Sequence, residues 1–206
     1  MNKYNIPEEM LDELLTPGYS TLETGYYRLS NGDLYAKVLT RMPGCKGKMV
    51  DWWFGFMGDT STYRIWHPAH RYLKWDEKWS PGQYVGATFE DIGTNQKGEK
   101  VAVKLKFLNP TELFNTLKFK SANIGCMAVT EVTHDAGGPD DYMIHCVRDT
   151  AFGCEMRSRF WLAKAPDEVG SDIIIHTLEE MGNLADFLPG LYNREIDWQK
   201  THCVKP

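Results

Sequence analysis

The chain has 206 residues, which is enough for one domain with a sizeable hydrophobic core. Its formal net charge of −5 and the lack of a basic cluster argue against nucleic acid or an anionic membrane surface as a partner. No apolar run approaches the roughly 20 residues of a membrane-spanning helix, and the stretch MNKYNIPEEM lacks a signal-peptide core. The five cysteines are odd in number and form no CxxC motif, so we expect a reducing, cytoplasmic setting without disulfides or a zinc knuckle.

A short helix is predicted near the start of the chain. Pro7 suits its first turn, where a missing N–H is tolerated, and the helix should run to about Leu15. It belongs to a small N-terminal arm, residues 1–22, which has too few apolar residues to fold alone. We therefore expect the arm to dock on a single domain formed by residues 23–206.

A hairpin and a second helix follow. Strands are predicted at residues 25–29 and 34–39, and the Asn31-Gly32 dipeptide between them is a typical tight-turn signal. Residues 47–57 (GKMVDWWFGFM) read as a helix whose aromatic side chains pack in the core.

The segment YRIWHPAH, residues 63–70, is the first candidate for chemistry. Pro68 disfavours the helical conformation for the residue before it, so we expect a turn to orient the side chain of His67. With His70 three residues later, the segment offers one metal ligand and one group for proton transfer. The competing interpretation is a pair of surface loop histidines.

The middle of the chain is dominated by strand signals. Strands are predicted at residues 83–91, 100–108, 123–132, 142–148 and 153–162. In the fourth of these, His145 shares a face with Met143 and Val147, because side chains alternate along a strand. Antiparallel strands followed by one long helix indicate an α+β fold, with a curved sheet around the terminal helix.

That terminal helix is predicted at residues 173–192, with Asp172 as its cap and Pro189-Gly190 as its stop. His176 and Glu180 lie one turn apart and therefore on the same face, among large apolar residues. Such a pair either forms a contact at the edge of the core or binds one metal ion from a rigid support.

A helix across the concave face of a curved sheet leaves a sheltered cavity. His67 from its turn, His145 from its strand and Glu90 from the strand at 83–91 could point into this cavity, together with the helical pair His176 and Glu180. Two histidines and two carboxylates make a nitrogen–oxygen site suited to Zn²⁺, or to Fe²⁺ or Mn²⁺.

At these motifs the chain resembles a known family. VDWWF, YRIWHPAH, VRDTAFGCEMRSRFWL and HTLEEMGNLADFLPGLY are similar to motifs of the 2,4-diacetylphloroglucinol hydrolase and phloretin hydrolase family, over about residues 25–192. The resemblance implies a helix-grip fold (Bet v 1-like or START-like) and one divalent metal, usually zinc. It also implies hydrolysis of the carbon–carbon bond between an acyl group and a phenolic ring.

The resemblance also implies roles for individual residues. Two histidines and two glutamates bind the metal in the family, and these map to His67, the helical pair and a strand position. Glu90 is the nearest fit for the strand position, ahead of its neighbours Asp91 and Glu99. His145 maps to a residue that contacts the substrate or transfers a proton.

For the reaction itself, we expect His145 or His70 to move the proton that the departing ring needs. The sequence contains 7 tryptophans and 10 tyrosines, which would suit a pocket for a flat aromatic ligand. Tyr63, Trp66 and Trp161 are the side chains predicted to contact the ring.

The expected partner is a small aromatic ketone, with neither nucleic acid nor membrane, and we allow for a homodimer. The chain departs from the family in its short arm, where the relatives carry a larger helical part, so the substrate and oligomeric state do not carry over. The competing function is a non-catalytic carrier of a small aromatic or apolar ligand, since helix-grip proteins often bind without reacting.

Overall fold

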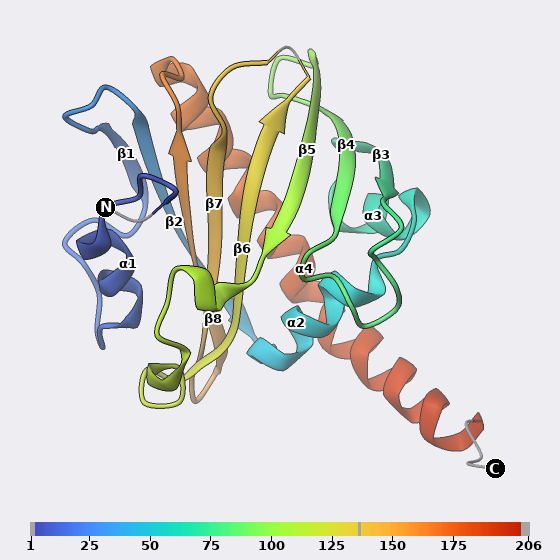
Figure 1. Cartoon of the computed structure of the whole chain (residues 1–206). Coiled ribbons are helices and arrows are strands. Elements are labelled where there is room, and N and C mark those ends of the chain that lie inside the picture. Colours follow the sequence, from blue (N-terminus) through green and yellow to red (C-terminus); the bar gives the residue numbers. More distant parts are fainter. Residues whose placement is uncertain (1–2, 136, 203–206) are drawn as a thin grey trace.

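The computed structural model describes residues 3–135 and 137–202, and within these ranges all strands join one antiparallel sheet. The strand order is β1-β2-β8-β7-β6-β5-β4-β3 (Figure 1). The strands are β1 (Gly25–Arg28), β2 (Leu34–Pro43), β3 (His70–Trp75), β4 (Thr88–Thr94), β5 (Lys100–Leu108), β6 (Ile124–His134), β7 (Asp141–Asp149) and β8 (Gly153–Leu162).

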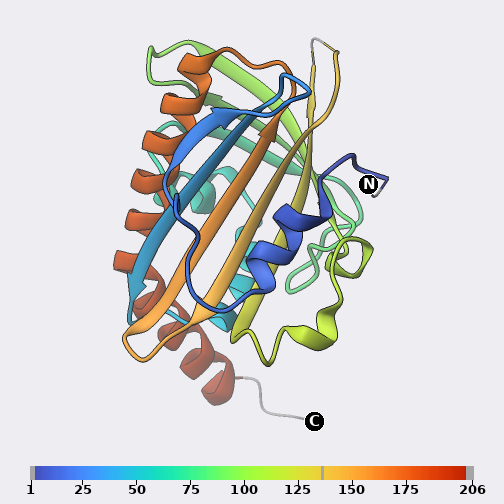
Figure 2. The same cartoon turned by 90° about the vertical axis from the view of Figure 1, so that its left-hand side faces the viewer.

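The helices lie on opposite faces of this sheet. They are α1 (Glu8–Leu15), α2 (Gly47–Phe56), α3 (Thr60–Trp66) and α4 (Asp167–His202). Figure 2 shows α4 along one side of the sheet and α1 on the other side. We call the side covered by α2, α3 and α4 the inner face and the side covered by α1 the outer face. A curved sheet gripping a long C-terminal helix is the helix-grip fold, which confirms the predicted fold class.

Alternation along the strands divides the core between the two faces. The inner face packs Phe107 and Val147 against Trp53 of α2 and Met181 of α4. The outer face carries its own buried cluster, in which α1 packs against residues such as Ile144. The structure confirms several predicted elements, namely the hairpin, the helix at 47–57 and the strands at 100–108 and 153–162. These elements could be predicted because each has a local sequence pattern.

Two elements beside the Trp-His-Pro motif did not appear among the predictions. Asp59 caps α3 by accepting a hydrogen bond from the Thr62 backbone N–H at 2.8 Å, and β3 forms the edge strand beside β4. The predicted strand at 83–91 begins too early, since β4 starts at Thr88. Gly82 and Gly86 have φ values of +81° and +91°, so this stretch turns before it becomes extended.

The terminal helix is longer than predicted at both ends. It begins at Asp167, whose carboxylate suits the first turn, so the predicted cap Asp172 lies inside the helix. It also continues through Pro189, which was predicted to stop it. Proline cannot donate to the carbonyl four residues earlier. Here the carbonyl of Ala185 accepts from the Cys45 thiol at 3.7 Å instead, so it is not left without a donor.

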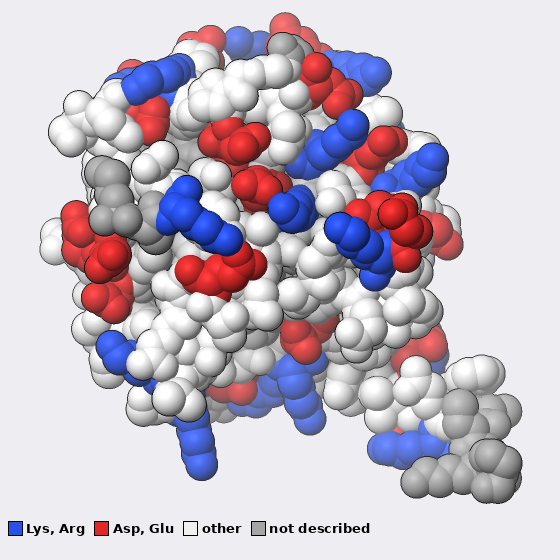
Figure 3. All heavy atoms as spheres, viewed as in Figure 1, with Lys and Arg blue, Asp and Glu red and all other residues white. Residues whose placement is uncertain are grey.

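The surface and the cysteines can be compared with the predictions of no membrane partner and no disulfides. No helix in the described ranges is long and apolar enough to cross a membrane. Acidic and basic side chains are interspersed on the face shown in Figure 3. Four cysteines are buried free thiols, namely Cys45, Cys126, Cys146 and Cys154, whereas Cys203 lies outside the described residues.

Candidate metal centre and its cavity

A cavity of about 420 Å³ lies between the inner face of the sheet and helices α3 and α4. Its volume falls within the range of sites that take drug-sized ligands. Most of its wall is apolar, with Phe54, Phe89, Leu105 and Phe160 among the lining residues. Polar side chains gather where α3, β3, β4 and the middle of α4 meet, and these form the candidate centre.

His67 follows the last residue of α3 and has an extended backbone, as predicted from Pro68. Its side chain is buried, and its Nδ1 accepts a hydrogen bond from the Ala69 backbone N–H at 3.1 Å. Its Nε2 lies 3.3 Å from a carboxylate oxygen of Glu179. The turn therefore fixes the ring and directs Nε2 towards α4.

His70 opens β3 and is also buried. Its ring stacks on Tyr63, with centroids 3.8 Å apart, and its Nδ1 lies 3.2 Å from the Tyr63 carbonyl. A carbonyl only accepts, so Nδ1 carries the proton and Nε2 keeps a free lone pair. That Nε2 lies 3.4 Å from a carboxylate oxygen of Glu180.

The helical pair completes the arrangement. The Nε2 of His176 lies 3.9 Å from a carboxylate oxygen of Glu180 one turn later. The ligand atoms of His67, His70 and His176 all lie within 4.8 Å of one another. The structure therefore brings three histidines together, one more than the motif-based ligand set contained.

The strand carboxylate in this cavity is Asp91, and Glu90 lies outside it. Asp91 lines the cavity, and its buried Oδ1 has no hydrogen-bond partner in the described part of the chain. Glu90 is exposed, with Lys74 and Lys104 opposite it on the neighbouring strands. Glu99 lies beyond the end of β4 and accepts from Asn95 in a turn. Side chains alternate between the two faces of a strand, so Asp91 lies on the same face as the apolar Phe89. This alternation would have indicated Asp91, and not Glu90, as the carboxylate in the cavity.

The charges of these groups depend on their burial. Burial lowers the pKa of His70 to about 3 and that of His176 to about 4, so both rings are neutral near pH 7. Burial also raises the pKa of Glu180 well above its usual range and that of Asp91 to about 7. A divalent cation binds neutral imidazoles and ionised carboxylates. It would also offset the cost of ionising carboxylates that are buried without a positive partner.

His145 lines another part of the same cavity, on β7. Its Nδ1 lies 2.8 Å from the hydroxyl oxygen of Ser158, and burial lowers its pKa to about 4. The ring packs near Phe54 and Phe160. His145 is therefore a fixed, neutral imidazole in an apolar wall.

The three aromatic residues predicted to contact substrate are divided by the sheet. Tyr63 and Trp66 line the cavity. Trp161 lies on the outer face instead, where its ring packs near Tyr35 and its indole N–H donates to the sulfur of Met10. Trp161 follows Phe160 in β8, and adjacent strand residues point to opposite faces. Because Phe160 points inward, Trp161 points outward, and the structure does not bring it to the site.

Comparison with known proteins shows which family this chain matches. Residues 7–167 match the family described as DAPG hydrolase PhiG domain. This match ends before the helical pair. A 2,4-diacetylphloroglucinol hydrolase of Pseudomonas protegens is 24% identical over 89% of this chain and 72% of the relative. A phloretin hydrolase of Eubacterium ramulus is 27% identical over 84% of this chain and 72% of the relative.

Solved structures support the fold alone. The crystal structure of Ara h 8.0201 has a TM-score of 0.52 at 11% identity, covering 76% of this chain and 98% of that one. Protein CV1439 from Chromobacterium violaceum has a TM-score of 0.52 at 14% identity, covering 75% of this chain and 97% of that one.

Proposed function

The chain belongs to the DAPG hydrolase PhiG domain family, and from this premise we propose that it is a metal-dependent hydrolase. Its reaction is cleavage of the carbon–carbon bond between an acyl group and a polyhydroxylated aromatic ring. The relatives named 2,4-diacetylphloroglucinol hydrolase and phloretin hydrolase support the reaction class. The four described free thiols agree with a reducing, cytoplasmic setting.

The metal would be held by His67, His70 and His176 together with the carboxylates of Glu180 and Asp91. The observation that carries this assignment is the gathering of three imidazoles whose ligand atoms lie within 4.8 Å of one another. Two carboxylates would balance the charge of a dication, and the orphaned Oδ1 of Asp91 would gain a partner. Zinc is the proposed ion because it favours nitrogen and oxygen donors, although Fe²⁺ or Mn²⁺ would also suit the set.

The metal, when bound, would polarise a substrate oxygen and lower the pKa of a bound water molecule. The protein's own groups set the geometry. The Tyr63 carbonyl accepts from His70 Nδ1 and so leaves the His70 Nε2 lone pair free for a metal. His67 Nδ1 accepts from the Ala69 N–H, so His67 would have to move its proton to Nδ1 and give up this contact to offer Nε2. Here His70 takes a metal-holding role instead of the proton-transfer role suggested by the sequence.

The remaining residues would handle the substrate. Tyr63 and Trp66 offer aromatic surface for the phenolic ring, and the apolar walls exclude bulk water. Release of the acyl group requires a proton on the ring carbon. His145 would transfer this proton through Nε2, since Ser158 holds its Nδ1.

The test is incubation of the zinc-loaded protein with acylphloroglucinols and dihydrochalcones, followed by chromatography. We expect the free phenol and the carboxylic acid to be released, and Glu180→Gln to abolish the release. Glu195→Gln, on the same helix but near its exposed end, is the matched control and should behave like wild type. Tight binding of the ketones without cleavage would instead favour the carrier function.

A further inference from the structure

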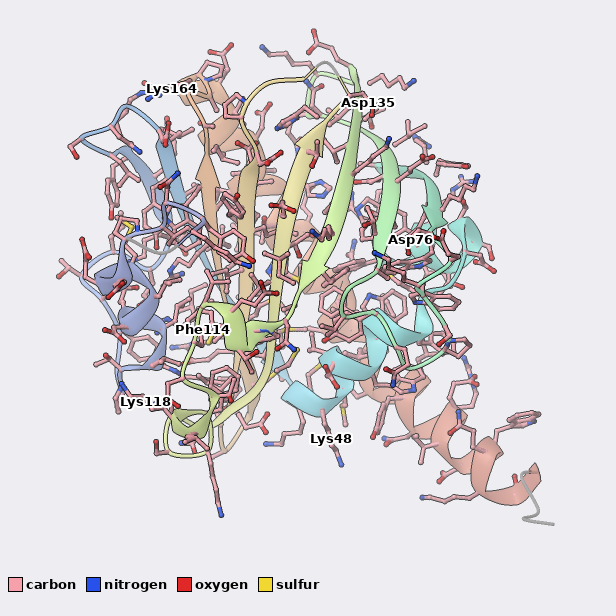
Figure 4. All side chains as sticks on the ribbon, in the orientation of Figure 1. Lys48, Asp76, Phe114, Lys118, Asp135 and Lys164 are labelled. Atoms are coloured by element: carbon pink, nitrogen blue, oxygen red, sulfur yellow. The ribbon has the colours of Figure 1, made fainter. Side chains whose placement is uncertain are left out.

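One aromatic side chain lies between two of the proposed metal ligands. Tyr63 belongs to α3, which packs beside β3 at the edge of the sheet, and Asp76, labelled in Figure 4, directly follows that strand. Tyr63 lines the cavity and is only 3% exposed. Its ring stacks on His70 of β3 and meets Phe89 of β4 edge to face, with centroids 3.8 and 5.9 Å apart. Tyr63 therefore contacts both strands that carry the ligands His70 and Asp91.

The backbone and the ring of Tyr63 both hold His70. The Tyr63 carbonyl oxygen lies 3.2 Å from His70 Nδ1 and accepts its proton. The two rings are nearly parallel, with an angle of 8° between their planes. The hydrogen bond decides which ring nitrogen is free, and the stacking restricts rotation of the imidazole. His70 Nε2 is thereby held in one direction.

The hydroxyl of Tyr63 interacts with the second ligand. Asp91 follows Phe89 by two positions in β4, so it lies on the same face as the ring that Tyr63 contacts. Burial raises the pKa of Asp91, and a hydrogen bond with the Tyr63 side chain opposes this rise. Burial also raises the pKa of Tyr63 well above its usual range, so the hydroxyl keeps its proton and can donate it to the carboxylate. Oδ1 of Asp91 has no partner among the described residues, so this oxygen remains for a metal.

We propose that Tyr63 is a positioning residue of the metal centre, whose carbonyl and ring orient His70 and whose hydroxyl orients Asp91. This inference rests on the proposed function, because it takes His70 and Asp91 as metal ligands. Groups that hydrogen-bond to a ligating side chain fix its direction, and loss of such a group weakens metal binding by about 10- to 100-fold. Because the hydroxyl is engaged with Asp91, it does not donate to a substrate.

A role in packing alone explains only part of these contacts. A phenylalanine at position 63 would fill the same space and keep both the stacking on His70 and the backbone carbonyl. The hydroxyl adds nothing to apolar packing, and a buried hydroxyl is unfavourable unless it has a hydrogen-bond partner. Tyr63→Phe therefore removes the contact with Asp91 and leaves the other contacts of the residue in place.

The experiment measures zinc affinity by calorimetric titration of metal-stripped wild type, Tyr63→Phe, Asp91→Ala and the double variant. Tyr72→Phe is the matched control, because Tyr72 also lies on this edge of the sheet, in β3, but is 37% exposed and does not line the cavity. Visible absorption of the Co²⁺-loaded proteins reports the arrangement of ligands around the ion. Circular dichroism checks that each variant is folded.

Tyr63→Phe should weaken zinc binding about tenfold and shift the Co²⁺ absorption, whereas Tyr72→Phe should match wild type. In the Asp91→Ala background, Tyr63→Phe should have no further effect, because the partner of the hydroxyl is gone. Wild-type zinc affinity in Tyr63→Phe overturns the inference, as does an equal loss of affinity with and without Asp91. A raised KM for the ketone at unchanged zinc affinity would instead make Tyr63 a substrate contact. If wild type binds no zinc, the proposed function fails and the inference fails with it.

Discussion

On the outer face of the sheet, the buried guanidinium groups of Arg157 and Arg159 donate to the carboxylates of Glu13 and Glu23 over distances of 2.7 to 3.2 Å. Lys37 adds a third cation, 3.0 Å from Glu13. On the inner face, the carboxylates of Glu180 and Asp91 have no Lys or Arg partner among the described residues. The same sheet therefore carries buried carboxylates in two different electrostatic environments.

The pKa values follow this difference. Burial alone would raise the pKa of Glu23, but hydrogen bonds from Arg157, the Ser20 N–H and Arg159 outweigh it and hold the value at about 2. Burial raises the pKa of Glu180, and the nearby Asp91 raises it further; burial also raises the pKa of Asp91, although a hydrogen bond with Tyr63 opposes that rise. The outer cluster is thus completed within the chain, whereas the inner one has no Lys or Arg partner among the described residues and is, under our proposal, completed by a cation from solution.

The largest expected effect comes from removing an inner-face nitrogen. His176→Ala should lower turnover of an aryl ketone by about 10³-fold or more and reduce the bound metal, because a direct ligand matters more than its supporting contacts. Metal content and kcat/KM measure this, and circular dichroism checks that the fold persists. Full metal content in this variant would contradict the assignment of His176.

On the outer face the expected effect is on stability. Glu23→Gln should lower the free energy of unfolding by about 3 kcal/mol, because two buried arginines lose part of their compensation. Urea unfolding measures this change, with the exposed Glu9→Gln as control. Metal content should equal that of wild type. A loss of metal would mean that the two faces are not independent.

Substitution of His145 tests whether a buried imidazole on the inner face takes part in the reaction without binding the metal. His145→Gln should slow turnover by about 10²-fold, the typical contribution of a proton-transfer group, while metal content stays at the wild-type level. Single-turnover kinetics and metal analysis on the same sample separate the two effects. Unchanged turnover would remove His145 from the reaction.

Acid should affect the outer cluster gradually. The folded-state pKa of Glu23 is depressed, so its contribution is present above about pH 4.5 and is lost as the pH falls through about 2. After allowance for solvent screening, about 2 kcal/mol of unfolding free energy should disappear in this window. The wild-type stability curve should fall more steeply there than that of Glu23→Gln, and parallel curves would refute this.

Much of this arrangement is encoded locally and could be predicted. Pro68 sets the conformation of His67, and the one-turn spacing of His176 and Glu180 needs only the helix to form. The fold class likewise follows from the strand pattern and one long helix. The two local features depend on residues close together in the sequence, and the fold class depends on strand and helix patterns that are each local.

The differences have two sources, the family mapping and contacts between distant residues. Glu90 was preferred over Asp91 because the family's ligand is a glutamate, although alternation from Phe89 favours Asp91; in the structure Glu90 is exposed, opposite Lys74 and Lys104. The thiol that contacts the Ala185 carbonyl, which Pro189 leaves without its helical donor, belongs to Cys45, far earlier in the chain. Trp161 was assigned to the pocket because its strand was predicted without knowing which face α1 covers.

The central claim is that the inner-face carboxylates are completed by a divalent cation. It is tested most directly by calorimetric titration of the metal-stripped protein with Zn²⁺, using wild type and two variants of adjacent residues. Wild type and Glu90→Gln should bind about one ion per chain with equal affinity, whereas Asp91→Asn should bind about 100-fold more weakly or worse, because a direct ligand matters more than its supporting contacts. Absence of binding in wild type, or weakening by Glu90→Gln and not by Asp91→Asn, would contradict the account.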